Sequence, residues 1–173
     1  MATNLTPMKP SGLAWRLVRD RLLSEDQAST ASTEALRQRQ PFVQYLVEQK
    51  ILDSRRIAIA ASHEFGVPLL DLAAIDLADL PLSLVDEKLI RKHRALPLHR
   101  RGNRLFLAVS DPTNDRALDE IRFNTGMATD AILVEEGKLA AAIDQAIDAQ
   151  DTTMTDLMDT DLDNLDIAND DEL

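Results

Sequence analysis

The sequence predicts an α+β fold. A duplicated helical-hairpin bundle precedes a small α-β-β-α-β-α domain with a three-stranded sheet, and a disordered acidic tail follows. Three observations predict this order: a helical pattern that repeats between residues 11 and 72, two short apolar strands around a basic turn, and a C-terminal run of acids. Each part can bury an apolar face only by packing its helices together or onto the sheet.

The composition limits the chemistry that the chain can perform. Of its 173 residues 45% are hydrophobic and 3% aromatic, so the core should consist of Leu, Ile, Val and Ala. The absence of cysteine excludes thiolate catalysis and cysteine-based zinc sites. No apolar run approaches the roughly 18 residues of a membrane span, and the N-terminus lacks a signal-peptide core. We therefore expect a cytoplasmic protein without direct membrane insertion.

The net charge of −11 comes mostly from the C-terminal tail. Residues 151–173 hold nine of the 30 acidic residues and no Lys or Arg, whereas residues 1–150 have 21 acids against 19 bases. A nearly neutral body does not displace counterions from nucleic acid, so we expect no nucleic-acid partner. Residues 149–173 should form a disordered acidic linker. A partner that orders the apolar residues of this tail is the alternative.

Four helices should follow a disordered start at residues 1–10 and fill a helical domain at residues 11–72. Their ends can be read from cap residues and helix breakers. These signals are Ser11 as an N-cap, the capping box of Ser24 and Gln27, Pro41 in a first turn, Asp53 or Ser54 as an N-cap, and Gly66 as a stop.

The four helices form two copies of one unit. Residues 17–28 align with residues 46–57 at an offset of 29, so that Leu17 matches Leu46 and Arg21 matches Lys50. Neither copy can bury its apolar face alone, and the copies should therefore pack together. Two hairpins that are similar by chance are the alternative.

A small α+β domain is expected at residues 73–148. Its elements are a helix at 82–94, strands at 95–100 and 104–110, a helix at 114–126, a strand at 128–135 and a helix at 137–150. Gly102 and Asn103 should supply the positive φ angles of a tight hairpin. Asn114 or Asp115 should cap the following helix, which Gly126 should end.

No group of residues in the sequence supports a catalytic, cofactor or metal site. The five glycines are too far apart for a Walker phosphate loop, and His63, His93 and His99 lack the spacing of zinc ligands. Residues 159–164 resemble the start of a calcium loop without its glycine. The basic turn at 99–104 has two interpretations, a phosphate grip or a hairpin, and hairpin and cap roles explain all its residues. An independent small enzyme is therefore the weakest hypothesis.

Three segments of the sequence resemble a known family. They are "FGVPLLDL" (65–72), "LIRKHRALPLHRRGNRLFLAVSDPTNDRALDEIRFNTG" (89–126) and "AILVEEGKLAAAID" (131–144). They are similar to the N-terminal region of type IV pilus assembly (extension) ATPases of the PilB type, in the type II secretion ATPase superfamily. The resemblance runs from about residue 11 to residue 148.

The resemblance implies a non-catalytic regulatory and docking region of a motor for pilus extension and twitching motility. ATP and Mg would bind only in a C-terminal hexameric ATPase domain beyond the acidic linker. The implied partners are a PilZ-type adaptor protein, an inner-membrane pilus platform protein and the C-terminal ATPase domain of the same chain. The implied location is the cytoplasmic face of the inner membrane.

The resemblance also implies where a partner would bind. Some relatives look like docking platforms for a PilZ-type adaptor, which contacts their helical part. An apolar stripe on this unit would serve such an interface. Its expected residues are Trp15, Leu17, Val18, Leu22 and Leu46. A core position is the alternative for Trp15.

A direct cyclic di-GMP sensor is the alternative function. In some relatives each copy of the unit binds this nucleotide through an arginine, two glycines and several apolar residues. Here Ala14 and Arg21 stand at the two glycine places of the first copy, and Val43 and Lys50 at those of the second. Glycine permits close backbone approach, so its loss fills space that the ligand would use. The residues implied in such a site are Leu13, Leu17, Arg21, Leu46 and Lys50.

Overall fold

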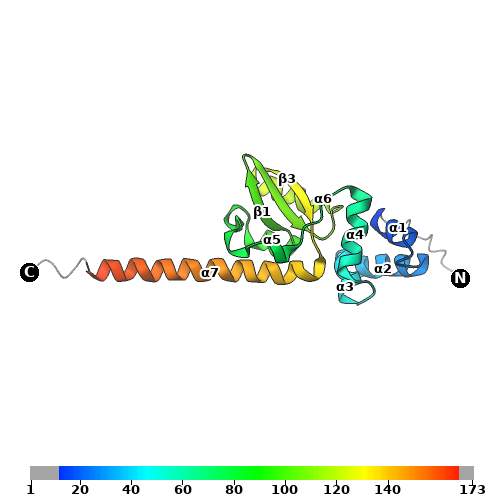
Figure 1. Cartoon of the computed structure of the whole chain (residues 1–173), viewed down its shortest axis with the longest axis horizontal. Coiled ribbons are helices and arrows are strands. Elements are labelled where there is room, and N and C mark those ends of the chain that lie inside the picture. The colour runs from blue at the N-terminus through cyan, green and yellow to red at the C-terminus, as the bar shows by residue number, and fades with distance from the viewer. Residues whose placement is uncertain (1–11, 168–173) are drawn as a thin grey trace, which may run out of the picture.

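The computed structural model describes residues 12–167, so Ser11 and the expected start at residues 1–10 lie outside the described residues. The fold has the predicted order of a helical unit followed by a small α+β unit (Figure 1). The helical unit consists of α1 (Gly12–Arg19), α2 (Glu25–Arg37), α3 (Phe42–Glu48) and α4 (Ser54–Phe65). The rest contains α5 (Glu87–His93), β1 (Leu96–Arg101), β2 (Arg104–Val109), α6 (Asp115–Thr125), β3 (Ala128–Leu133) and α7 (Glu136–Ile167).

The helix ends confirm most of the cap assignments. Ser24 and Gln27 form the capping box of α2, and the Asp53 carboxylate accepts from the backbone N–H groups of α4. Pro41 occupies the N-cap of α3, one position before the expected first turn. Gly66 ends α4 in the left-handed conformation, with φ 63°, where glycine carries no steric penalty.

The sheet has the order β1-β2-β3, with β1 antiparallel and β3 parallel to β2. Helix α6 supplies the crossover between the two parallel strands. At the β1–β2 turn Gly102 has φ 60°, but Asn103 is not among the described residues with positive φ, so that expectation was wrong. The carbonyl of Asn103 accepts instead from the N–H of Ala128 at 2.9 Å, which ties the turn to the start of β3.

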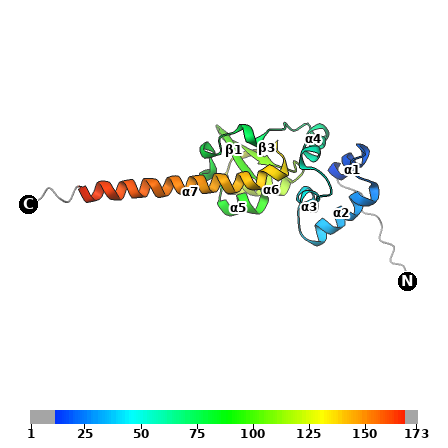
Figure 2. The ribbon, with the colours of Figure 1, turned by 60° about the horizontal axis from the view of Figure 1, so that its bottom comes forward.

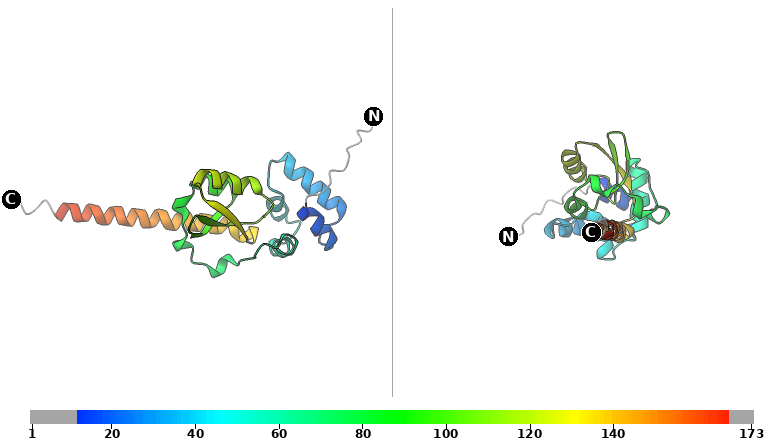
Figure 3. Two further views of the ribbon diagram at one scale, coloured as in Figure 1. Left: turned by 90° about the horizontal axis from the view of Figure 1, so that it is seen from above. Right: turned by 90° about the vertical axis from the view of Figure 1, so that its left-hand side faces the viewer.

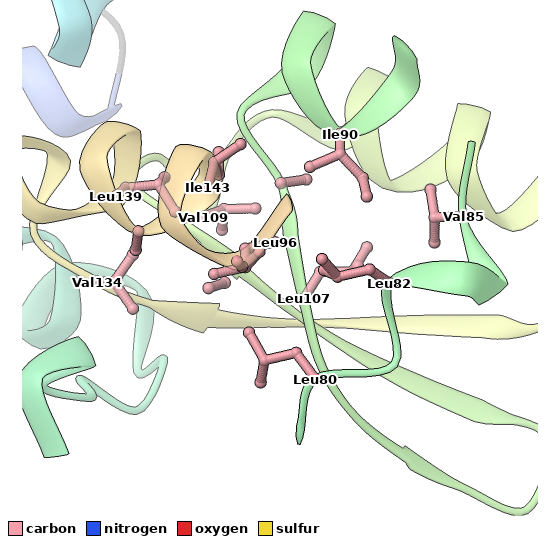
Figure 4. Packing of buried hydrophobic residues seen from close by; sticks show 14 of the residues in the cluster. Leu80, Leu82, Val85, Ile90, Leu96, Leu107, Val109, Val134, Leu139 and Ile143 are labelled. Atoms are coloured by element: carbon pink, nitrogen blue, oxygen red, sulfur yellow. The ribbon is translucent and has the colours of Figure 1, made fainter. Parts of the chain in front are cut away.

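Two apolar clusters form the core. The larger one packs the sheet against α5, α7 and the connecting turns, and Figure 4 shows its aliphatic side chains meeting between these elements. The smaller one fills the helical unit and includes Leu133 at the end of β3. Backbone bonds from Leu133 to Pro68 and Leu70, at 2.9 and 2.8 Å, join the two parts of the molecule.

The sequence predicts a helix at 82–94, but α5 begins only at Glu87, so the segment between α4 and α5 is longer than expected. It forms three short 3₁₀ turns at Leu72–Ala74, Leu77–Asp79 and Leu82–Leu84. The carboxylates of Asp71 and Asp76 accept from backbone N–H groups two residues later, both at 3.0 Å, and so open the first two turns. Such aspartate side chains stabilise a turn locally. The leucines of the 3₁₀ turns pack in or against the larger cluster.

The tail differs from the expectation of disorder from residue 149 onward. Helix α7 continues to Ile167 and leaves the body of the molecule as a single rod (Figures 1 and 2). Neither glycine nor proline interrupts it after Gly137, and threonine hydroxyls such as that of Thr152 donate to the carbonyl four residues earlier. Acidic composition alone therefore does not prevent helix formation here. Residues 168–173 of the tail lie outside the described residues.

Candidate functional site

The duplication visible in the sequence is a duplication of backbone geometry. Arg21 follows α1 with φ 60°, and Lys50 follows α3 with φ 54°. The N–H of the next residue bonds back to the carbonyl of Leu17 at 2.9 Å in the first copy and of Leu46 at 3.0 Å in the second. The two copies therefore end their first helices with the same turn, in which the sequence places Arg and Lys at positions that favour glycine.

The side chains at the other glycine places are buried. Ala14 and Val43 both belong to the cluster that fills the helical unit. Because their Cβ atoms already occupy that interior, a ligand that needs close backbone approach at these two places meets packed side chains.

The residues expected to contact a partner or a nucleotide fall into two groups. Leu13, Leu17 and Leu46 are fully buried, so their side chains offer no surface in this conformation. The others are accessible at least in part. Trp15, Arg21 and Lys50 are exposed, while Val18 and Leu22 are half-buried against the cluster.

Trp15 is exposed over 52% of its surface and lies on α1, three residues before Val18. Residues three apart are neighbours on a helix surface. Trp15 therefore lies at the surface and not in the core, the two positions that the sequence allows. A large amphipathic ring in such a place is typical of interface anchors.

Ion pairs hold α1 against α4. The guanidinium of Arg16 contacts Asp20 at 2.7 Å and Glu64 at 3.1 Å, and Arg19 reaches the same Glu64 oxygen at 3.2 Å. The hydrogen bonds that the Arg16 guanidinium donates to Asp20 and then to Glu64 raise the pKa of Arg16. The exposed face of α1 is thereby held in a fixed position relative to the second copy.

A groove lies between the two copies. Asp20 and Leu22 line it from the first copy, and Arg56, Ile59 and His63 line it from α4 of the second. Its volume of about 220 Å³ is below the 300 Å³ or so of a typical small-molecule pocket. The apolar lining of Leu22 and Ile59, with Arg56 beside it, suits an apolar side chain of a partner. Sequence reasoning missed Ile59 and Arg56 because only the fold brings α4 beside the first turn.

A second feature joins the helical unit to the rest of the molecule. Glu136, at the start of α7, is only 3% exposed. Its Oε1 atom accepts from Arg94, which also pairs with Glu48 of α3 at 3.5 Å. Its Oε2 atom has no hydrogen-bond partner among the described residues. Glu136 is one of the residues that line a cavity of about 20 Å³. This contact fixes the helical unit but offers little space for a ligand.

Comparison with known proteins identifies the type of domain. A profile described as the MshEN domain matches residues 65–153, just over half of the chain. The chain belongs to the MshEN domain family. The match spans the whole predicted α+β domain and begins where α4 ends.

Relatives that share more sequence extend the similarity to the helical unit. The type IV pilus assembly ATPase PilB of Pseudomonas aeruginosa is 40% identical over 162 residues, which are 94% of this chain and 29% of that protein. The protein of the same name from Acinetobacter baylyi is 40% identical over 139 residues, 80% of this chain and 24% of that protein. The chain thus spans less than a third of the length of these curated relatives, and the resemblance to pilus assembly ATPases is confirmed.

Solved structures show the same fold. MshE, solved with cyclic di-GMP, superimposes with a TM-score of 0.58 and 23% identity, over 78% of this chain and 97% of that one. The N-terminal domain of XpsE gives a TM-score of 0.60 and 20% identity, over 79% and 96%. The fold, a helical unit followed by an α+β unit, is therefore shared by proteins of low sequence identity.

The described residues offer neither a metal site nor a membrane span. No cluster of three or more potential metal ligands occurs among residues 12–167. Within the same described range, no helix has the length and hydropathy needed to span a bilayer.

Proposed function

We propose that this chain is the regulatory and docking region of a longer type IV pilus assembly ATPase. Its helical unit binds a PilZ-type adaptor or the inner-membrane platform protein of the pilus, at the cytoplasmic face of the membrane. The chain itself takes no part in ATP hydrolysis but couples partner binding to the ATPase part. Support comes from the 40% identity to two PilB proteins and from the shared MshEN fold.

One observation carries the docking role. Trp15 is half exposed on α1, whereas the neighbouring apolar residues Leu13 and Leu17 are fully buried. A tryptophan that the core does not require keeps a large apolar surface in water at a cost of about 25 cal/mol per Å². An interface would recover that cost, and Trp is among the residues that most often dominate interface energetics.

Calorimetric titration of the full chain with a PilZ-type adaptor tests this role. Trp15→Ala should weaken binding by about tenfold or more, as expected for an interface anchor. The matched control is Leu36→Ala on α2, since Leu36 is also an exposed apolar residue, at 62%. Equal affinity of wild type and Trp15→Ala would contradict the proposed surface.

A cyclic di-GMP sensor is the second candidate, because MshE was solved with this nucleotide. Arg21 and Lys50 lie in equivalent turns and are exposed, so both are available to a phosphate. The buried Ala14 and Val43 oppose close approach. NMR titration at tens of micromolar nucleotide separates the functions: shifts around residues 13–23 and 42–52 support the sensor, and their absence supports docking alone.

A further inference from the structure

The second half of α7 projects from the body. Gln150 donates from Nε2 to the carbonyl of Leu80 at 2.9 Å, and this bond marks the point where α7 leaves the body. All residues from 151 to 158 are exposed, and so is Thr160. We call residues 151–160 the distal α7. Figure 3 shows it extending away from the sheet and its helices.

The apolar stripe of α7 does not stop where the body stops. Ile143 and Ile147 are buried in the larger cluster. Met154 follows Ile147 by seven residues, about two helical turns, and therefore lies on the same face. Leu157 and Met158 lie on this face as well, three and four residues after Met154. All three side chains are more than 60% exposed. The distal α7 thus carries an exposed apolar stripe, which a partner surface could bury.

The charge around this stripe defines what can cover it. In sequence, residues 151–160 contain three acids, Asp151, Asp156 and Asp159, and no base. Carboxylates near a helix C-terminus oppose the helix dipole, and a helix without packing is marginally stable in water. A covering surface should therefore combine an apolar groove with cations. Two distal α7 segments would repel each other and do not meet this condition.

Such a surface exists on the helical unit of the same chain. The groove between the copies has Leu22 and Ile59 as its apolar part, with Arg56, His63 and Asp20 beside them. The Asp20 carboxylate is already paired with the guanidinium of Arg16 at 2.7 Å. Arg21, next to Leu22, is exposed. Residues 12–66 have eight Lys and Arg against seven Asp and Glu, whereas residues 67–150 have ten against fourteen. The helical unit is therefore the more basic part of the described chain.

The distal α7 cannot reach this groove within one molecule. The helical unit and the distal α7 lie at opposite ends of the structure in three independent views (Figures 1, 2 and 3). The distal α7 could fold back across the body only if α7 broke after Gln150, and the helix is continuous from Glu136 to Ile167. The complementary surfaces can meet only between two molecules.

We propose that the distal α7 of one copy docks in the groove of a second copy, head to tail. Met154, Leu157 and Met158 would contact Leu22 and Ile59 of the other copy, and the surrounding aspartates would face its basic residues. This contact requires no second protein, so it goes beyond the adaptor docking proposed above. A heterologous contact of this kind builds a ring or an open chain of subunits.

Sedimentation velocity of the full chain, without an adaptor, tests the contact. The weight-average mass should rise above the 19.2 kDa of one chain as the concentration approaches about 1 mM, as expected for a small interface. It should fall back when salt is raised from about 50 mM to about 500 mM, because exposed charges are then screened. A mass of one chain under all these conditions overturns the proposal.

Substitutions in the distal α7 leave the body intact and locate the contact. Met154→Ser/Leu157→Ser/Met158→Ser should remain a single chain at every concentration. The control, Thr152→Ser/Thr155→Ser, changes residues off the stripe and should associate like the wild type. Association that persists in the triple variant overturns the proposal.

A charge exchange identifies the two surfaces as partners. Arg21→Glu/Arg56→Glu and Asp151→Lys/Asp156→Lys should each be monomeric alone, since like charges then face each other. An equimolar mixture of the two should associate, because each groove again meets a helix of opposite charge. A mixture that stays monomeric overturns the head-to-tail arrangement, whatever the outcome of the adaptor titration.

Discussion

Arg21 and Lys50 adopt the same left-handed backbone conformation at equivalent positions of the two copies, 29 residues apart. Each donates its N–H to the carbonyl three residues earlier, at 3.0 Å to Val18 and 3.1 Å to Val47. Non-glycine side chains in this region cost about 1 kcal/mol. The two copies therefore maintain one backbone geometry with residues that are not suited to it.

Glycine should be better tolerated than alanine at both positions. We expect Arg21→Gly to be more stable than Arg21→Ala by about 1 kcal/mol, because both variants lose the charge and only alanine keeps the Cβ strain. Urea unfolding measures the difference. At Arg19, the last residue of α1, the order should reverse, since glycine is a poor helix former. If the glycine variant were the more stable one at both positions, backbone strain at Arg21 would not explain the difference.

The buried leucines of the duplicated unit should behave as core residues. Leu17→Ala and Leu46→Ala each leave a cavity in the packed unit, and each should lower the free energy of unfolding by about 2–5 kcal/mol. Trp15→Ala removes an exposed side chain and should change it by less than about 1 kcal/mol. Urea unfolding of the three variants checks this. A small effect at Leu17 would show that the unit is not packed as described.

The sequence predicts those features of this fold that depend on neighbouring residues. The capping box at Ser24, the stops at Gly66 and Gly126 and the three strands all follow from local rules. The offset of 29 residues also anticipates the matching turns. Local patterns cannot show how α4 lies beside the first turn, which forms the groove through Arg56 and Ile59.

The buried position of Glu136 shows the same limit. In the sequence it is one of two adjacent glutamates before a helix, and nothing marks it as buried. Its partner Arg94 is 42 residues away. Trp15 is a related case, since an apolar residue on an amphipathic helix can face the core or the solvent, and only packing decides. The acidic composition of residues 149–173 predicts disorder, whereas the absence of glycine and proline after Gly137 allows α7 to continue to Ile167.

Removing Arg94 should leave a buried carboxylate without its counter-charge. We expect Arg94→Met to lower the free energy of unfolding by about 3 kcal/mol, because a lone buried charge is costly. Arg94→Met/Glu136→Leu should recover part of this loss, since it removes both charges. A double-mutant cycle by urea unfolding measures the coupling. Additive effects would mean that the two side chains do not interact.

Glu120 should contribute to stability above, but not below, the acid range. Hydrogen bonds from Lys92 and then His93 hold the pKa of Glu120 below its ordinary value of 4.5. The unfolded chain therefore binds more protons than the folded chain as the pH falls through this range, and the stabilisation is lost. The urea midpoint of Glu120→Gln should decline less than that of the wild type between about pH 6 and pH 3. Parallel curves would rule out this linkage.

Placing glycine at the four glycine places of the two copies should show whether the present side chains block nucleotide binding. If Ala14, Arg21, Val43 and Lys50 block nucleotide access, replacing all four by Gly should raise the affinity for cyclic di-GMP above that of the wild type. Calorimetry measures the affinity, and circular dichroism verifies the helical content. The control is Arg39→Gly, because Arg39 also has positive φ, at 54°, but lies after α2. Unchanged affinity in the fourfold variant would show that other residues determine nucleotide binding.

The proposal that the helical unit is the docking surface is tested most directly by hydrogen exchange of the full chain with and without a PilZ-type adaptor. Binding should slow amide exchange in α1 and the turn that follows it, around Trp15 and Leu22, and leave the sheet at residues 96–133 unchanged. Protection confined to the sheet, or none under saturating adaptor, would contradict the account.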